Sequence, residues 1–391
     1  MSDVYVPPVV LSDRQNHIYL AGLQGQRPTI PISPDEMEAQ ARAKLSPEAF
    51  AYVAGGAGGE DTMRANREAF ARWRIVPRML RDVSTRDLRV EVLGQQFATP
   101  IMLAPVGVLS IVHPDAEVAV ARAAASMGVP FTLSTAASRP MEEVARAAGG
   151  AQRWYQLYWS RDPELTASMV RRAEAAGYGA IVVTLDTRML SWRERDLQNA
   201  YLPFLLGEGV GNYFSDPVFR QALDRPIEEN PQAAIMHFVR VFSNAALTWD
   251  DLGFLRQHTR LPILLKGILH PEDAERALDA GADGIIVSNH VGRQLDGAIA
   301  ALDALPPVVA AERGRAPVLF DSGIRRGADV VKALALGARM VLVGRPYVYG
   351  LALGGEAGVR EAVLNLLADL DVTVALTGYR SIAELTPNLL V

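Results

Sequence analysis

The most constraining feature of this sequence is a series of short apolar runs that alternate with segments rich in Ala, Glu and Arg. The runs are residues 101–108, 131–136, 154–159, 180–186, 262–268, 284–290, 317–322 and 339–345. Most of the segments between them end in glycine, as helices commonly do. Near-continuous hydrophobic strands with helical crossovers are typical of a parallel sheet covered on both faces. Eight such units in roughly 250 residues predict an α/β fold, a (β/α)8 TIM barrel.

A doubly wound open sheet would show the same alternation. That fold binds dinucleotides through a glycine-rich turn after its first strand. Here the corresponding turn is Pro105-Val106-Gly107, which lacks that fingerprint. We therefore expect the barrel.

The chain is expected to have two parts. Residues 1–95 form an N-terminal arm and a helical collar, with helix starts at Ser33-Pro34 and Ser46-Pro47 and a third helix over 61–72,. Residues 96–391 form the barrel, which ends in a C-terminal helical tail from Gly354.

One connection in the barrel is unusually long. About 75 residues, roughly 187–261, separate the fourth apolar run from the fifth. An insertion at the carboxyl end of a strand is commonly a lid or binding loop. Its glycine-rich stretch 207–213 is predicted to act as a hinge.

Composition narrows the function classes. The net charge is −5 and no long basic run occurs, which argues against a nucleic-acid partner,. The chain has no cysteine, which excludes disulfides and thiolate chemistry,. No signal peptide or membrane-spanning run is evident, so a soluble cytoplasmic protein is expected,. No His, Asp or Glu cluster has metal-ligand spacing, so we expect no metal.

The sixth apolar run leads into a segment of distinctive chemistry. It ends at Ser288-Asn289-His290, and Arg293 follows closely. Histidine suits proton transfer near neutral pH, and arginine binds a carboxylate with two parallel hydrogen bonds. A base beside a carboxylate anchor fits a substrate whose reacting carbon adjoins its acid group. A capping histidine and a solvated arginine are the alternative.

Polar residues also follow the other runs, at the end of a barrel where active sites form. They are Ser134, Gln156, Tyr158, Thr184, Asp186, Arg193 and Lys266. Asp186 is expected either to orient an imidazole or to cap a helix. Lys266 is expected either to form a structural ion pair or to stabilise a ring that becomes anionic when reduced.

The last two runs carry a predicted phosphate site. Asp321-Ser322-Gly323-Ile324-Arg325 follows the seventh run, and Gly344-Arg345-Pro346 follows the eighth. Barrels bind phosphate at these two loops through backbone amides and guanidinium groups. Two ordinary glycine turns with surface arginines are the alternative.

With these motifs in view, the chain resembles the FMN-dependent 2-hydroxy acid oxidising family over roughly residues 35–385. The resemblance rests on YVAGGA from Tyr52, IVPRMLRDV, APVGV, QLYW, VTLDT, LLKGI, SNHVGRQLDG, FDSGIRRGADV and VGRP. It implies FMN as cofactor, a small 2-hydroxy acid and O2 as reactants, and a homotetramer or higher homo-oligomer.

The resemblance also implies residue roles. His290 is the base and Asp186 orients it. The implied substrate-binding residues are Tyr52, Tyr158, Arg193, Arg293 and Tyr213. The implied FMN-binding residues are Pro105, Val106, Gly107, Ser134, Gln156, Thr184, Lys266, Ser288, Asp321, Ser322, Gly323, Arg325, Gly344 and Arg345.

Within the family, three features point toward lactate 2-monooxygenase, which converts L-lactate and O2 to acetate, CO2 and water. The reasons are Gly107, where oxidases usually have alanine, the lid-like sequence 212–219 and the N-terminal arm. Ala136, where glycolate-type members carry tryptophan, leaves room for a larger side chain. An oxidase or dehydrogenase, acting on larger or aryl hydroxy acids, is the alternative.

The chain departs from the family pattern at one position, Val291, where glycine is usual. If the backbone there needs a positive φ, valine costs on the order of 1–3 kcal/mol. A flavin-binding protein of low activity is therefore a further alternative. The last alternative is a barrel that binds a phosphate compound and carries out no redox reaction.

Overall fold

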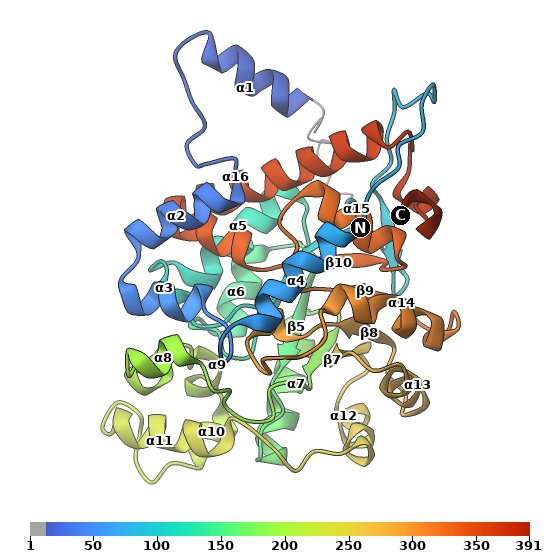
Figure 1. Cartoon of the computed structure of the whole chain (residues 1–391). Coiled ribbons are helices and arrows are strands. Elements are labelled where there is room, and N and C mark those ends of the chain that lie inside the picture. The colour runs from blue at the N-terminus through green and yellow to red at the C-terminus, as the bar shows by residue number, and fades with distance from the viewer. Residues whose placement is uncertain (1–12) are drawn as a thin grey trace.

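The computed structural model describes residues 13–391, and its centre is a closed parallel barrel (Figure 1). Its strand order is β10-β3-β4-β5-β6-β7-β8-β9. The strands are β3 Ile101–Leu103, β4 Phe131–Ser134, β5 Arg153–Leu157, β6 Ile181–Thr184, β7 Ile263–Ile268, β8 Gly284–Val287, β9 Val318–Phe320 and β10 Met340–Val343. Each lies within or overlaps one of the eight predicted runs, so the predicted barrel is confirmed.

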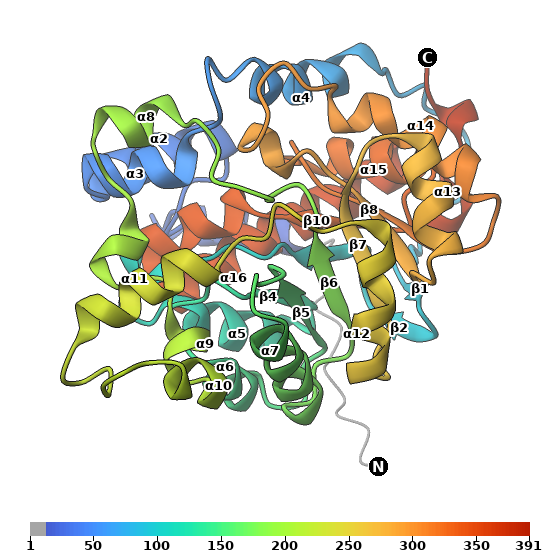
Figure 2. The ribbon, with the colours of Figure 1, turned by 90° about the horizontal axis from the view of Figure 1, so that it is seen from below.

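Helices surround the barrel (Figure 2). They are α5 Ala116–Met127, α6 Met141–Ala148, α7 Pro163–Ala175, α12 Leu252–His258, α13 Pro271–Asp279, α14 Ala301–Glu312, α15 Gly327–Ala335 and α16 Arg345–Leu376. The long α16 packs against both α15 and α5 and so completes the ring. It begins earlier than the tail predicted from Gly354, and its backbone breaks at Gly354 and Gly355.

The predicted collar is present as α2 Pro34–Lys44, α3 Pro47–Ala54 and α4 Asp61–Arg72. The side chains of Ser33 and Ser46 accept hydrogen bonds from the first turns of α2 and α3, as predicted,. Before them, α1 Arg14–Gly22 projects beyond the rest of the molecule (Figure 1). The division of the chain at residue 95 stays a prediction.

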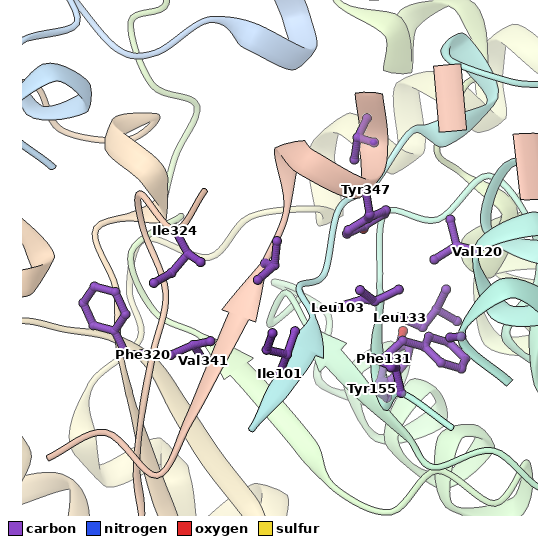
Figure 3. Packing of buried hydrophobic residues seen from close by; sticks show 14 of the residues in the cluster. Ile101, Leu103, Val120, Phe131, Leu133, Tyr155, Phe320, Ile324, Val341 and Tyr347 are labelled. Carbon is purple, nitrogen blue, oxygen red and sulfur yellow. The ribbon is translucent and has the colours of Figure 1, made fainter. Parts of the chain in front are cut away.

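The barrel strands contribute to two hydrophobic clusters, one outside and one inside the barrel, because side chains alternate along each strand,. Ile101 of β3 and Val341 of β10 are directly paired and belong to the outer cluster, between strands and helices (Figure 3). The smaller inner cluster contains Met102, Trp154, Val182, Leu264, Ile286, Leu319 and Leu342.

A hairpin that sequence analysis did not find packs against the inner cluster. It consists of β1 Val90–Val92 and β2 Gln95–Phe97. Phe97 meets Trp154 edge-to-face with a centroid distance of 6.2 Å. Val92 and Phe97 are almost fully buried. The hairpin therefore contributes to the hydrophobic packing of the barrel interior.

The insertion between β6 and β7 is mostly helical. It contains α8 Glu194–Gln198, α9 Gly211–Phe214, α10 Pro217–Gln221 and α11 Pro231–Val241, with 3-10 turns at Pro203–Leu206 and Trp249–Asp251. Helices α8, α10 and α11 lie at the lower left of Figure 1. Among residues 13–391, no helix is both long and apolar enough to cross a membrane.

The glycine-rich stretch of the insertion is firmly packed, which does not support the predicted hinge. A Cβ at Gly211 would lie 2.6 Å from the carbonyl oxygen of Ser138. The fully buried Asn212 donates to the carbonyls of Ser134 and Thr135, at 3.2 and 3.1 Å. Its oxygen accepts from the backbone N–H of Met141 at 2.8 Å. This stretch therefore anchors the insertion to the end of β4.

Candidate active site

The inward-facing positions change from apolar to polar at the carboxyl ends of the strands. Two residues beyond the inner-cluster members Trp154, Val182, Leu264 and Ile286 stand Gln156, Thr184, Lys266 and Ser288. All four polar side chains are buried. Because side chains alternate with period two, the strands deliver these groups to one end of the barrel.

Lys266 is the centre of a buried polar network. Its Nζ lies 3.0 Å from Oδ2 of Asp321 and donates to Oγ of Ser288 at 2.8 Å. Burial opposes the charge of Lys266, but the carboxylates of Asp321 and Asp186 outweigh this and raise its pKa,. Lys266 is therefore a fixed cation at the base of the site.

His290 and Asp186 form the pair predicted from the sequence. Nδ1 of His290 lies 2.8 Å from Oδ1 of Asp186. With the proton on Nδ1, Nε2 keeps a lone pair that can take a proton. Burial lowers the pKa of His290, and the raising effect of Asp186 compensates only in part. The imidazole is therefore neutral, and competent as a base, at neutral pH.

The loop that carries His290 has an uncommon backbone conformation. His290 and Val291 have φ of 55° and 57°, in the left-handed region that favours glycine,. The condition under which a valine at position 291 is strained, a positive φ, is therefore met. The collar supports the loop, because the side-chain amides of Asn66 and Asn289 exchange hydrogen bonds of 2.9 and 2.8 Å.

Two arginines lie close together beside the base. Arg293 donates to the carbonyl oxygens of Tyr52 and Gly55 at 2.6 and 2.7 Å. Arg193 donates through Nε to the backbone carbonyl of Arg293 at 3.1 Å. Burial, with the nearby charge of Arg193, lowers the pKa of Arg293 to about 9. An anion between these guanidinium groups would relieve this unfavourable charge.

A second pair of cations marks the predicted phosphate site. Burial and the neighbouring charge of Arg345 lower the pKa of Arg325 to about 10. Arg345 donates to the carbonyls of Val53 and Gly55, but its buried Nη1 has no partner in the described part of the chain. Gly323 has φ of 101°, which glycine adopts readily,. An anionic group such as a phosphate suits this arrangement.

A cavity joins the two arginine pairs. Its empty space, including the part open to solvent, is about 1550 Å³. The predicted residues that line it are Tyr52, Pro105, Val106, Gly107, Ser134, Tyr158, Arg193, Lys266, His290, Arg293, Asp321, Ser322, Gly323, Arg325, Gly344 and Arg345. Gln156, Thr184, Asp186, Ser288 and Tyr213 do not line it.

Tyr213 occupies a different place from the one expected of a substrate-binding residue. Its side chain is 1% exposed and packs edge-to-face on Phe238, with centroids 4.7 Å apart. Phe238 and Phe242, with Phe204, line the cavity instead. Sequence analysis missed these three phenylalanines because nothing in the local pattern of the insertion shows which aromatic residues face the barrel.

The buried polar groups of the site fit an FMN molecule. The Oε1 of Gln156 accepts from Ser134 at 2.9 Å, whereas its buried Nε2 has no partner among residues 13–391. An amide donor without a partner is costly unless a ligand completes it. Together with Lys266 and the Arg325–Arg345 pair, it fits a polar heteroaromatic ring that carries a phosphate.

The fold and the site together define a (β/α)8 barrel with a buried histidine–aspartate pair and two pairs of arginines around one cavity. Residues 41–391 match the family described as FMN-dependent dehydrogenase. The chain belongs to this family. It is an FMN-dependent 2-hydroxy acid oxidoreductase, as its relatives also indicate.

Relatives match almost the whole chain. An L-lactate oxidase from Lysinibacillus sphaericus is 46% identical over 368 residues, covering 94% of each chain. An FMN-dependent alpha-hydroxy acid dehydrogenase from Penicillium citrinum is 45% identical over 383 residues, covering 97% of this chain and 95% of that protein. The solved structure of a mandelate oxidase with (S)-4-hydroxymandelic acid is 42% identical, with a TM-score of 0.81, and the match covers 92% of this chain and 98% of that one.

Proposed function

We propose that the chain is an L-2-hydroxy acid oxidase that forms a 2-oxo acid and hydrogen peroxide from its substrate and O2. The observation that carries the proposal is that His290, which pairs with Asp186, lines one cavity together with Arg193 and Arg293. Several relatives are named oxidases, among them a 4-hydroxymandelate oxidase from Amycolatopsis orientalis, 43% identical over 353 residues, with 90% of this chain and 96% of that protein covered. These names favour an oxidase over the expected monooxygenase.

Gly107 no longer separates these two reactions. A Cβ at Gly107 would lie 2.7 Å from the carbonyl oxygen of Ala136 and 2.9 Å from its Cβ. Close packing therefore explains this glycine without reference to the fate of the product. The anchored glycine-rich stretch 207–213 shows how the insertion is held and does not separate the two reactions.

Each group in the proposed reaction has one task. Arg193 and Arg293 bind the substrate carboxylate, and Tyr52 assists them. Tyr158 contacts the hydroxyl side of the substrate. His290 takes a proton at Nε2 as the substrate is oxidised, and Asp186 stabilises the imidazolium. FMN, when bound, accepts the two electrons that leave the substrate.

The proposed cofactor contacts are those that the family resemblance implies. Lys266, Gln156 and Ser134, with the segment Pro105–Gly107, Thr184 and Ser288, hold the flavin ring. Asp321, Gly323 and Arg325, with Ser322, Gly344 and Arg345, hold the phosphate end. Lys266 stabilises negative charge on the reduced ring.

The substrate side chain is proposed to be apolar and larger than that of glycolate. Ala136 and the ring edges of Phe204 and Phe242, which are 5.4 Å apart between centroids, border the cavity. Tyr158 packs on Phe242 at 5.2 Å and extends this apolar wall. Each additional methylene of the substrate that is buried against this wall contributes about 0.8 kcal/mol to the binding free energy.

Product analysis tests the proposal. The FMN-loaded protein is mixed in air with L-lactate and, separately, with (S)-mandelate. One hydrogen peroxide per 2-oxo acid is expected. Acetate and CO2 from lactate without free peroxide would overturn the oxidase and restore the monooxygenase. Yellow protein that neither acid bleaches under nitrogen would instead support a flavin-binding protein of low activity.

Two further expectations stay predictions. One is the homotetramer or higher homo-oligomer. The other is the cytoplasmic location. A rice relative, 43% identical over 357 residues and with 91% of this chain and 95% of that protein covered, is named a peroxisomal (S)-2-hydroxy-acid oxidase.

A further inference from the structure

Ser322 connects the catalytic loop to the end of β9 by an unusual set of hydrogen bonds. Its side chain is buried, with the residue 2% exposed. Its Oγ accepts from the backbone N–H groups of Asn289, at 3.3 Å, and Val291, at 3.0 Å. The same hydroxyl donates to Oδ1 of Asp321 at 2.9 Å. One side chain therefore satisfies backbone groups on both sides of His290.

These bonds belong to a closed circuit. Asp321 binds Lys266 through its other oxygen, and Lys266 donates to Oγ of Ser288. Oγ of Ser288 accepts the backbone N–H of His290 at 3.0 Å. The circuit thus links three consecutive backbone N–H groups, at residues 289 to 291, to the lysine at the base of the cavity.

The conformation of the loop explains why such support matters. Val291 is β-branched, and its φ of 57° lies where side chains with a Cβ are disfavoured,. Ser322 itself has φ of 88°. A conformation of this kind persists only when the surrounding contacts hold it. If Val291 turned to a favourable φ, the neighbouring His290 would be drawn away from Asp186.

We propose that Ser322 is a positioning residue that holds the His290–Val291 segment in its left-handed conformation and so keeps the imidazole paired with Asp186. This role differs from the cofactor contact that the family resemblance implies for the loop. The inference requires the 2-hydroxy acid oxidoreductase chemistry of the family. It is independent of whether the final product is peroxide or water.

The test is a double-mutant cycle of S322A and V291G, with the rate of flavin reduction by substrate under nitrogen as the readout. S322A is expected to slow reduction by on the order of 10- to 100-fold, the effect of a small misplacement of a reacting group. The rate of flavin reduction in S322A should stay low at saturating FMN. Because glycine accepts the positive φ at position 291 without support, S322A should slow flavin reduction less in the V291G background, where only His290 of this segment keeps a disfavoured φ,.

Two further variants make the outcome decisive. S322G also removes the hydroxyl, but relieves the positive φ at 322, so it guards against simple misfolding and should be slowed like S322A. S126A removes a serine on α5 whose side chain, among residues 13–391, bonds only within its helix, at 2.8 Å to the carbonyl oxygen of Ala123, and should leave flavin reduction unchanged.

Either of two results would overturn the proposal. One is equal losses from S322A in both backgrounds. The other is recovery of the full rate at saturating FMN, which would make Ser322 a cofactor contact alone. If even the unsubstituted enzyme produced acetate and CO2, the oxidase proposal would fail, but the cycle would still be readable from flavin reduction.

Discussion

Replacing Val291 by glycine should stabilise the protein although it removes an apolar side chain. A left-handed φ costs a residue with a Cβ roughly 1–2 kcal/mol, and Val291 has φ of 57°,. Glycine loses more conformational entropy on folding, at a cost of roughly 0.5–1 kcal/mol. The expected net gain is therefore about 1 kcal/mol. For 391 residues this is about a 1 °C rise in Tm,.

Calorimetry of the FMN-saturated protein can measure such a shift. V291A is the matched control, because it removes the two γ-methyl groups of valine but keeps the Cβ that the positive φ disfavours. V291G should therefore have a higher Tm than V291A. A V291G Tm at or below that of the unsubstituted protein, or equal gains for both variants, would refute the argument from backbone strain.

Three other predictions concern the base and the insertion. Burial lowers the pKa of His290 below its ordinary value of 6.5. A plot of kcat/KM against pH should therefore rise with a midpoint below 6.5 and be level at neutral pH,. A midpoint above 6.5 would contradict this prediction. D186N removes the charge that raises this pKa, so the midpoint should move lower and anaerobic flavin reduction should slow by about 10²–10⁴-fold; an unchanged rate would exclude Asp186 as the orienting group,. N212A leaves buried backbone groups without partners, which costs about 1–3 kcal/mol of folding stability for each group,. Hydrogen exchange over residues 207–216 should therefore accelerate more than in α7. An equal change in both segments would show that Asn212 does not anchor the insertion.

Much of the architecture is predictable from local patterns. The eight apolar runs give the strands, and serine-proline pairs give the starts of α2 and α3. Alternation along a strand is a local property, so Lys266 could be expected to point inward at a carboxyl end. The absence of the usual glycine at position 291 raised a positive φ only as a condition, and the structure shows that Val291 has one.

Other features depend on contacts between distant segments. Hairpin β1–β2 is short and partly polar, and its role becomes clear only when Phe97 meets Trp154. The insertion contains several aromatic residues, yet only folding decides that Phe204 and Phe242 reach the cavity and that Tyr213 lies behind them.

The sequence by itself determined the barrel and the cofactor class and predicted the base, because each is encoded in a short segment with its own periodicity or motif. The tertiary structure decided how the base is held. The Asn66–Asn289 pair joins groups 223 residues apart, and the bond from Val291 to Ser322 spans 31. Neither pairing has a local signal, since hydrogen bonds between loops depend on where closure of the barrel brings their ends.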